Sequence, residues 1–229
     1  MARQPWSAAP RHLHAQPLTR KHVELLRKTL TAITPATADP VTVDELKEWG
    51  RIDSDCDDSL LAGLISSATA SVELYLKRAL VTQTLKMTLD LPCRRDNWTP
   101  GYFEMPVSAL FEPLPEQIEL MRAPIQSITS VTTYDLSNNG SVYSSSNYSL
   151  IGDRLVLNST ASWPSSLRLA GAVEIVYAAG YGEANDIPQP IRTAILMTAA
   201  AMYDSRGSCD QNGLAPGAAR LLTQYRVYG

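Results

Sequence analysis

The pattern of apolar positions along the chain changes its period twice. Between residues 57 and 78 apolar side chains recur three or four positions apart, which predicts a long helix with one buried face. In TLKMTLDL (84–91) apolar and polar residues alternate instead, which is typical of a strand with one buried face. The helical period returns over 188–206, after prolines that suit the first turn of a helix. The sequence therefore predicts two long helices that bracket a β-rich stretch.

Shorter elements complete the predicted plan. VTVDELKEWG predicts a helix over 42–50, in which Thr42 is the N-cap, Glu45 completes a capping box and Gly50 ends the helix. LTRKHVELLRKTL (18–30) predicts a further short amphipathic helix. Short runs of β-forming residues between turn signals predict five more strands. These strands are expected at 118–121, 127–134, 148–150, 155–157 and 172–178.

Together these elements predict an α+β fold. Its core is a helical bundle of two long helices and short ones, and a small antiparallel β-sheet is inserted at about 81–180. The main domain is expected to span 41–229, and its last part, 207–229, is expected to be an arm. Residues 1–40 are expected to be a flexible extension with one short helix.

Charge separates the leader, 1–40, from the rest of the chain. The leader has a net charge of +4 and the remaining residues carry −7, for a total of −3. A basic arm on an acidic body suits a contact with an acidic protein surface or with nucleic acid, and a solvated flexible leader would show the same composition. The candidate contact residues of this arm are Arg20, Lys21, Val23, Leu26, Arg27, Lys28 and Leu30.

Composition argues against several classes of protein. The three cysteines are widely spaced and form no C-x-x-C pair, so neither a disulfide frame nor a zinc site is expected. The N-terminus has no apolar core of the kind that a signal peptide needs, and no membrane partner is expected. All three histidines lie in the leader, and the sequence has no nucleophile-elbow, zinc-protease or P-loop motif. We therefore expect no enzyme activity, no catalytic residue and no cofactor.

The acidic run DSDCDD (53–58) allows two interpretations. Asp53, Asp55 and Asp57 have the spacing of the first ligands of a calcium loop. Such a loop needs Gly at its sixth position and Glu at its twelfth, where this chain has Asp58 and Leu64. The alternative is a helix N-terminus, where carboxylates accept hydrogen bonds from free backbone N–H groups and oppose the helix dipole. The pattern favours the cap, and no metal is expected.

Aromatic residues are concentrated in a Pro-rich segment, 92–117. Trp98, Tyr102 and Phe103 lie there, where a packed core is hard to build, and exposed aromatic residues mark many protein interfaces. They are therefore interface-loop candidates, and a loop that folds back on its own sheet is the alternative.

Six blocks of sequence, in this order, resemble the head–tail connector (adaptor, or head-completion) proteins of long-tailed bacteriophages. They run from residue 41 to 227, and both the leader and the long 92–117 segment depart from the family pattern. The blocks are VTVDELKEWGRIDSDCDDSLLAGLISSATASVELYLKRAL, APIQSITSVTTYD, NYSL, VEIVYAAGYG, DIPQPIRTAILMTAAAMYDSRG and LLTQYRV.

The resemblance implies a structural virion protein at the head–tail junction, assembled in the cytoplasm of the bacterial host. It implies a homo-oligomeric, dodecameric ring that binds the portal protein and the next connector or tail-completion protein. DNA would pass through the lumen without sequence-specific binding. Because adaptors of this family grip the portal with terminal segments, the resemblance also implies portal-binding residues in the C-terminal arm. The candidates are Arg220, Leu221, Leu222, Tyr225, Arg226, Val227 and Tyr228.

Two other functions compete with this one. A tail-completion or tail-terminator ring protein of the same virion would be dominated by β-structure, without two long helices around the sheet. A small phage hydrolase that uses an acidic pair would need groups that the sequence lacks, above all a histidine in the globular part.

Overall fold

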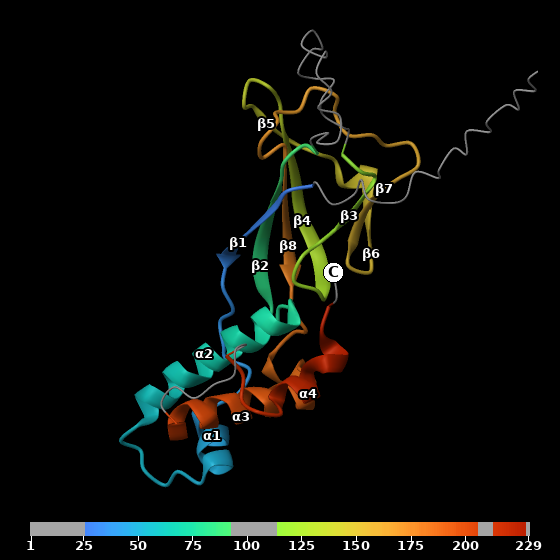
Figure 1. The fold of residues 1–229 in the computed structure, drawn as a ribbon. Coiled ribbons are helices and arrows are strands. Elements are labelled where there is room, and N and C mark those ends of the chain that lie inside the picture. Colours follow the sequence, from blue (N-terminus) through green and yellow to red (C-terminus); the bar gives the residue numbers. More distant parts are fainter. Residues whose placement is uncertain (1–25, 93–113, 206–212, 228–229) are drawn as a thin grey trace, which may run out of the picture.

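The computed structural model describes residues 26–92, 114–205 and 213–227. These residues form an elongated molecule with a helical module at one end and a β module at the other (Figure 1). The mixed α+β class predicted from the sequence is confirmed. We call the region where the two modules meet the waist; the chain passes between the modules after β1, after α2 and after β8.

The helical module is built around its second long helix. The helices are α1 (Val43–Gly50), α2 (Asp58–Leu76), α3 (Gln189–Ser205) and α4 (Ala218–Leu222). α3 lies between α2 and α1 (Figure 1), and its apolar side chains join those of α2 in one buried cluster. Leu61, Ile65, Val72 and Leu76 supply the buried face of α2, as the helical spacing predicts.

The capping box of α1 is confirmed. The Glu45 N–H donates to Thr42 Oγ1 at 3.2 Å, and the Thr42 N–H donates to Glu45 Oε2 at 2.9 Å. The helix ends at Gly50 as predicted, and Arg51 takes the left-handed conformation (φ 53°) that closes it. A main-chain bond back to the carbonyl of Lys47 stabilises this ending.

The β module contains two antiparallel sheets instead of the single sheet expected. The larger has the order β1-β2-β8-β4-β5 and the smaller the order β3-β7-β6. Their apolar side chains share one buried cluster. The strands are β1 (Lys28–Thr34), β2 (Gln83–Leu89), β3 (Gln117–Glu119), β4 (Ile125–Tyr134), β5 (Gly140–Val142), β6 (Tyr148–Ile151), β7 (Arg154–Leu157) and β8 (Val173–Ala179). Three short 3-10 helices, η3 (Ser145–Asn147), η4 (Ala184–Asp186) and η5 (Thr223–Tyr225), complete the described chain.

Two predictions for the chain ends are wrong where the structure describes them. The helix expected over 18–30 does not include 28–30, because these residues belong to β1, which pairs with β2 from Lys28 opposite Leu89. The threonines of KTLTAIT favour a strand, and pairing with β2 outweighs the local helical spacing. At the other end, the expected arm contains α4, whose Ala218 and Leu222 are buried in the helical core.

Candidate assembly surfaces

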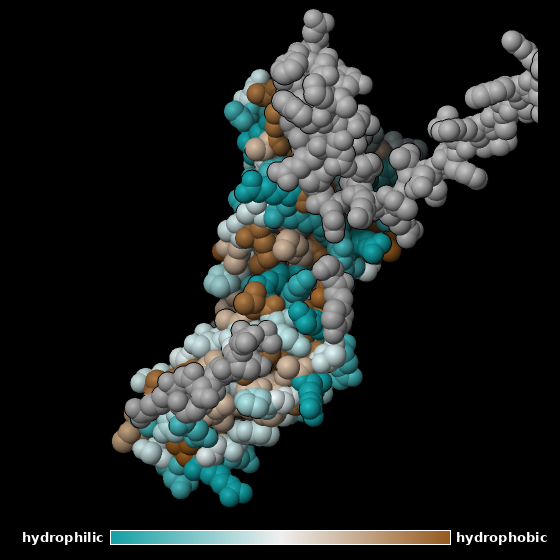
Figure 2. Space-filling model, in the orientation of Figure 1, coloured by the Kyte–Doolittle hydropathy of each residue, from teal (hydrophilic) through white to brown (hydrophobic). Residues whose placement is uncertain are grey.

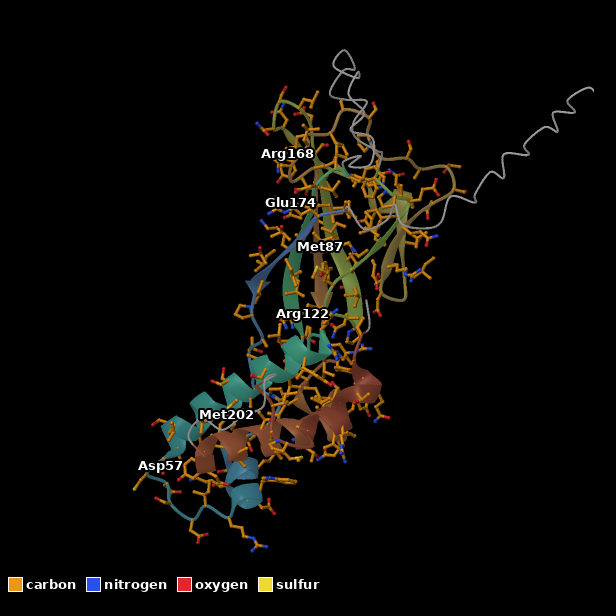
Figure 3. All side chains as sticks on the ribbon, viewed as in Figure 1. Asp57, Met87, Arg122, Arg168, Glu174 and Met202 are labelled. Atoms are coloured by element: carbon orange, nitrogen blue, oxygen red, sulfur yellow. The ribbon has the colours of Figure 1, made fainter. Side chains whose placement is uncertain are left out.

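The acidic run at the start of α2 binds a lysine of α1 and a tyrosine of α3. Lys47 Nζ lies 2.6 Å from Asp55 Oδ1 and 2.5 Å from Asp58 Oδ1. The hydroxyl of Tyr203, near the end of α3, donates to Asp57 Oδ2 at 2.7 Å. Asp57 occupies the N-cap position and Asp58 lies in the first turn, as predicted, but the expected cap hydrogen bond from the Asp57 side chain is not made. The run instead ties α2 to α1 and α3, at the far end of the helical module (Figure 3).

The lysine also explains the electrostatics of this run. Its hydrogen bond and charge lower the pKa of the Asp55 carboxyl, and the two carboxylates raise the pKa of Lys47. Within the described ranges, no group of three or more His, Cys, Asp or Glu residues could hold a metal ion. The calcium-loop interpretation therefore gains no support from the geometry, because two of the acidic side chains already bind an ammonium group.

We expect added calcium to leave the melting temperature of the protein unchanged. The reason is that Asp55 and Asp58 already bind the ammonium group of Lys47, and the run lacks the closing ligand of a calcium loop. Thermal unfolding followed by circular dichroism, with calcium and with a chelator, measures the effect. A calcium-dependent rise of several degrees would show that the run binds the ion.

At the waist, arginines link the two modules to the C-terminal segment. Arg78 Nε donates to the carbonyl of Tyr225 at 2.6 Å, and the Val227 N–H donates to the carbonyl of Leu76 at 3.1 Å. Arg122, which lies between the end of α2 and the sheet (Figure 3), donates to the carbonyl of Arg78 at 3.3 Å. The last described residues are thus fastened to the body of the molecule.

A half-buried carboxylate completes the waist. Burial raises the pKa of Glu73, although its Oε1 accepts hydrogen bonds from the Leu80 N–H at 2.8 Å and from Gln83 Nε2 at 3.3 Å. Arg122 Nη1 lies 4.0 Å from its Oε2. These contacts fix the turn that leads from α2 into the β module.

The structure separates the portal-binding candidates by exposure. Arg220 and Leu221 are exposed, and Tyr225, Arg226 and Val227 are half-buried. Leu222 is fully buried in the helical core, so it cannot serve as a surface contact in this fold. Tyr228 lies outside the described residues. The guanidinium carbon of Arg226 lies 4.7 Å from the centroid of the Tyr75 ring. Arg226 therefore makes a cation–π contact within its own subunit.

The other two groups of candidates are only partly described. Trp98, Tyr102 and Phe103 lie outside the described residues, as do Arg20, Lys21 and Val23. Leu26 and Leu30 pack partly against the β core, and Lys28 Nζ donates to the carbonyl of Glu119 at 2.8 Å. Burial lowers the pKa of Lys28. Arg27 is exposed. The structure therefore places this part of the leader in contacts within its own subunit.

A surface groove of 480 Å³ lies at the waist and was not foreseen from the sequence. Leu74 of α2, which is 70% exposed, and Met121 form part of its apolar lining, beside Leu26 and Val227. Figure 2 shows hydrophobic residues at the surface where the two modules meet. Periodicity could not reveal this groove, because its lining residues come from five separate parts of the chain.

The tip of the β4–β5 hairpin is a second surface that the sequence did not reveal. The Asp135 carboxylate accepts from the N–H groups of Ser137 and Asn139 at 2.8 and 2.9 Å, which orders the turn. Leu136 and Val142 on this hairpin are 70% and 77% exposed. The Asn-Gly signal predicts the turn, but no local pattern shows that these apolar side chains remain uncovered.

Comparisons with known proteins identify a related family and related folds. Residues 40–149 match the family model described as phage gp6-like head–tail connector protein. No curated protein sequence matches the chain. Chains from three particle structures share the fold at low sequence identity.

The first of these chains is from the neck of an empty GTA particle computed with C6 symmetry. It matches with a TM-score of 0.67 and 18% sequence identity, and the match covers 88% of this chain and 96% of that one. A chain from the virion of a native gene transfer agent (GTA) particle matches with a TM-score of 0.64 at 20% identity, over 87% and 96%. A chain from the neck of a native GTA particle computed with C12 symmetry gives 0.63 at 20% identity, over 88% and 96%.

Proposed function

We propose, from the confirmed resemblance of this chain to phage head–tail connector proteins, that it is a structural virion protein which forms a ring between the portal and the tail. The ring would be a dodecamer that extends the DNA channel and completes the head for tail attachment. The observation that carries the proposal is the agreement of two independent comparisons: the family match over 40–149 and a fold shared with chains of GTA necks over 88% of the chain.

The surface of the protein supports a structural role. Exposed apolar side chains on both modules, among them Leu74, Leu136 and Val142, are of the kind that subunit contacts cover. The chain beyond the leader is acidic, and an acidic lumen would let DNA slide without binding its phosphates. In the described part of the chain the acidic run is occupied by Lys47 and Tyr203, which argues against its use as an acid/base pair of a hydrolase.

In the proposed ring, the exposed part of the C-terminal segment, 213–227, would bind the portal. Arg220 and Leu221 project from α4, beside the half-buried Tyr225 and Arg226. Arginine and aromatic side chains at the edge of a buried apolar group have the composition of binding hot spots. The folded helix presents them in a fixed geometry, which lowers the entropic cost of docking.

Removal of the gene tests the function. We expect cells that lack the protein to accumulate heads without tails next to complete free tails, because the surface that joins them is missing. Electron microscopy of the lysate and a complementing wild-type copy provide the measurement and its control. Tails of uncontrolled length would favour the tail-terminator alternative, and normal tailed particles would refute the proposal.

A further inference from the structure

The outer face of α2 is apolar and uncharged. From Ser59 to Val72 the helix contains no charged residue. By length and composition α2 is even apolar enough to cross a membrane, yet only 28% of that stretch is buried. The exposed residues from Leu60 onward, which we call the α2 outer face, are Leu60, Ala62, Gly63, Ser66, Ser67, Ala70 and Leu74. A helix at a protein surface normally turns charged and polar residues to water. The composition of this face is therefore that of a covered surface.

The shape of this face suits another protein surface. Leu60 and Leu74 are 47% and 70% exposed, and they lie about 21 Å apart along the helix at 1.5 Å per residue. Between them the side chains are small, and a Cβ added at Gly63 would meet nothing within 4 Å. Small residues let a facing helix pack closely, with an interaxial distance of about 8 Å, the lower limit of the usual range. Leu74 also lines the groove at the waist, so the two apolar surfaces are continuous.

We propose that the α2 outer face packs against the helical module of a neighbouring copy of the same chain. This inference rests on the proposed ring. A closed ring of more than two subunits needs two different faces on each copy that fit one another. The second face is available on α1, where Trp49 is 49% exposed. α1 lies across α3 from α2 (Figure 1), so one molecule carries both halves of a head-to-tail contact within its helical module.

Charge distribution favours a protein over a lipid surface as the occupant. The acidic run precedes α2 directly, and α1 adds Asp44, Glu45 and Glu48 to that end of the module. An anionic membrane would repel this end. A second copy offers exposed apolar side chains such as Trp49, and the core of a protein interface is depleted of charged residues.

Two substitutions test the contact without touching the core. Gly63→Glu and Ala70→Glu each place a charge on the α2 outer face, where the isolated subunit has room for it. Ser159→Glu places the same charge on an exposed turn of the β module and is the matched control. We expect all three purified variants to melt no lower than the wild type, because each site is exposed. We expect the two α2 variants, and not the control, to lose about tenfold or more in copies per particle, because an unpaired charge would be buried at the interface.

Trp49→Ala tests the opposite half of the contact. This change should also lower incorporation, because it removes the largest exposed apolar group of α1. Normal incorporation of Trp49→Ala would overturn the assignment of α1 to the contact. Normal incorporation of both Gly63→Glu and Ala70→Glu would overturn the α2 contact and leave the proposed function standing.

Two further outcomes are decisive. Absence of the wild-type protein from particles would refute the proposed function, and this inference with it. Flotation of the purified wild type with phosphatidylcholine vesicles, lost in Gly63→Glu and Ala70→Glu, would identify a lipid surface as the occupant and overturn the proposal.

Discussion

Gly180→Ala is expected to destabilise the protein strongly, although it adds only one methyl group. Gly180 follows β8 at the waist with φ +134°, a conformation that residues with a side chain rarely adopt. A Cβ there would lie 2.6 Å from the carbonyl oxygen of Val81 and 2.7 Å from the backbone nitrogen of Thr82. Both are main-chain atoms and cannot rotate away. Strain and overpacking each cost about 1–3 kcal/mol, so we expect a loss of about 2–6 kcal/mol.

Gly63→Ala is the matched control for this prediction. The same methyl group is added in the middle of α2, where nothing lies within 4 Å. It should raise stability by about 0.5–1 kcal/mol, because glycine is a poorer helix former than alanine. Urea unfolding followed by circular dichroism measures both variants. Similar midpoints for Gly180→Ala and the wild type would show that the waist can relax around the added group.

Leu222→Ala is expected to cost about 2–5 kcal/mol, the usual range for a buried leucine cut back to alanine. Leu222 is fully buried in the helical core. Its neighbour Leu221 is 36% exposed, so Leu221→Ala should change the free energy of unfolding by only about 0.5 kcal/mol. The two variants separate an effect on stability from an effect on assembly, because Leu221 can contact a partner protein and the buried Leu222 cannot.

This contrast matters for any truncation of the C-terminus. Deletion of 220–229 would remove all the portal-binding candidates that the resemblance implies. The structure predicts that the deletion also removes Leu222 from the core and the carbonyl that binds Arg78. Loss of attachment in Leu221→Ala with an unchanged melting curve would therefore identify a portal contact. If Leu222→Ala melts like the wild type, the C-terminal segment does not pack as described.

The candidate surfaces differ in whether the sequence alone could indicate them. The family resemblance indicated residues 220–228 as contacts, and the charge distribution indicated the leader. Neither of them gave any sign of the groove beside Leu74 or of the exposed hairpin tip at Leu136. An apolar residue in a sequence is expected to be buried, and only the packed structure shows which apolar residues find no cover within the subunit.

What the sequence determined by itself are the elements whose signals are local. α1 follows from its capping box, α2 and α3 from their helical period, and β2 from alternation. What only the tertiary structure decided are the pairings between distant segments. β1 joins the sheet through β2 in place of a helix, the strands divide into two sheets, and Lys47 binds the acidic run that was expected to cap α2. The physical reason is that periodicity records which face of a segment is buried, whereas the partner that buries it is chosen by contacts far along the chain.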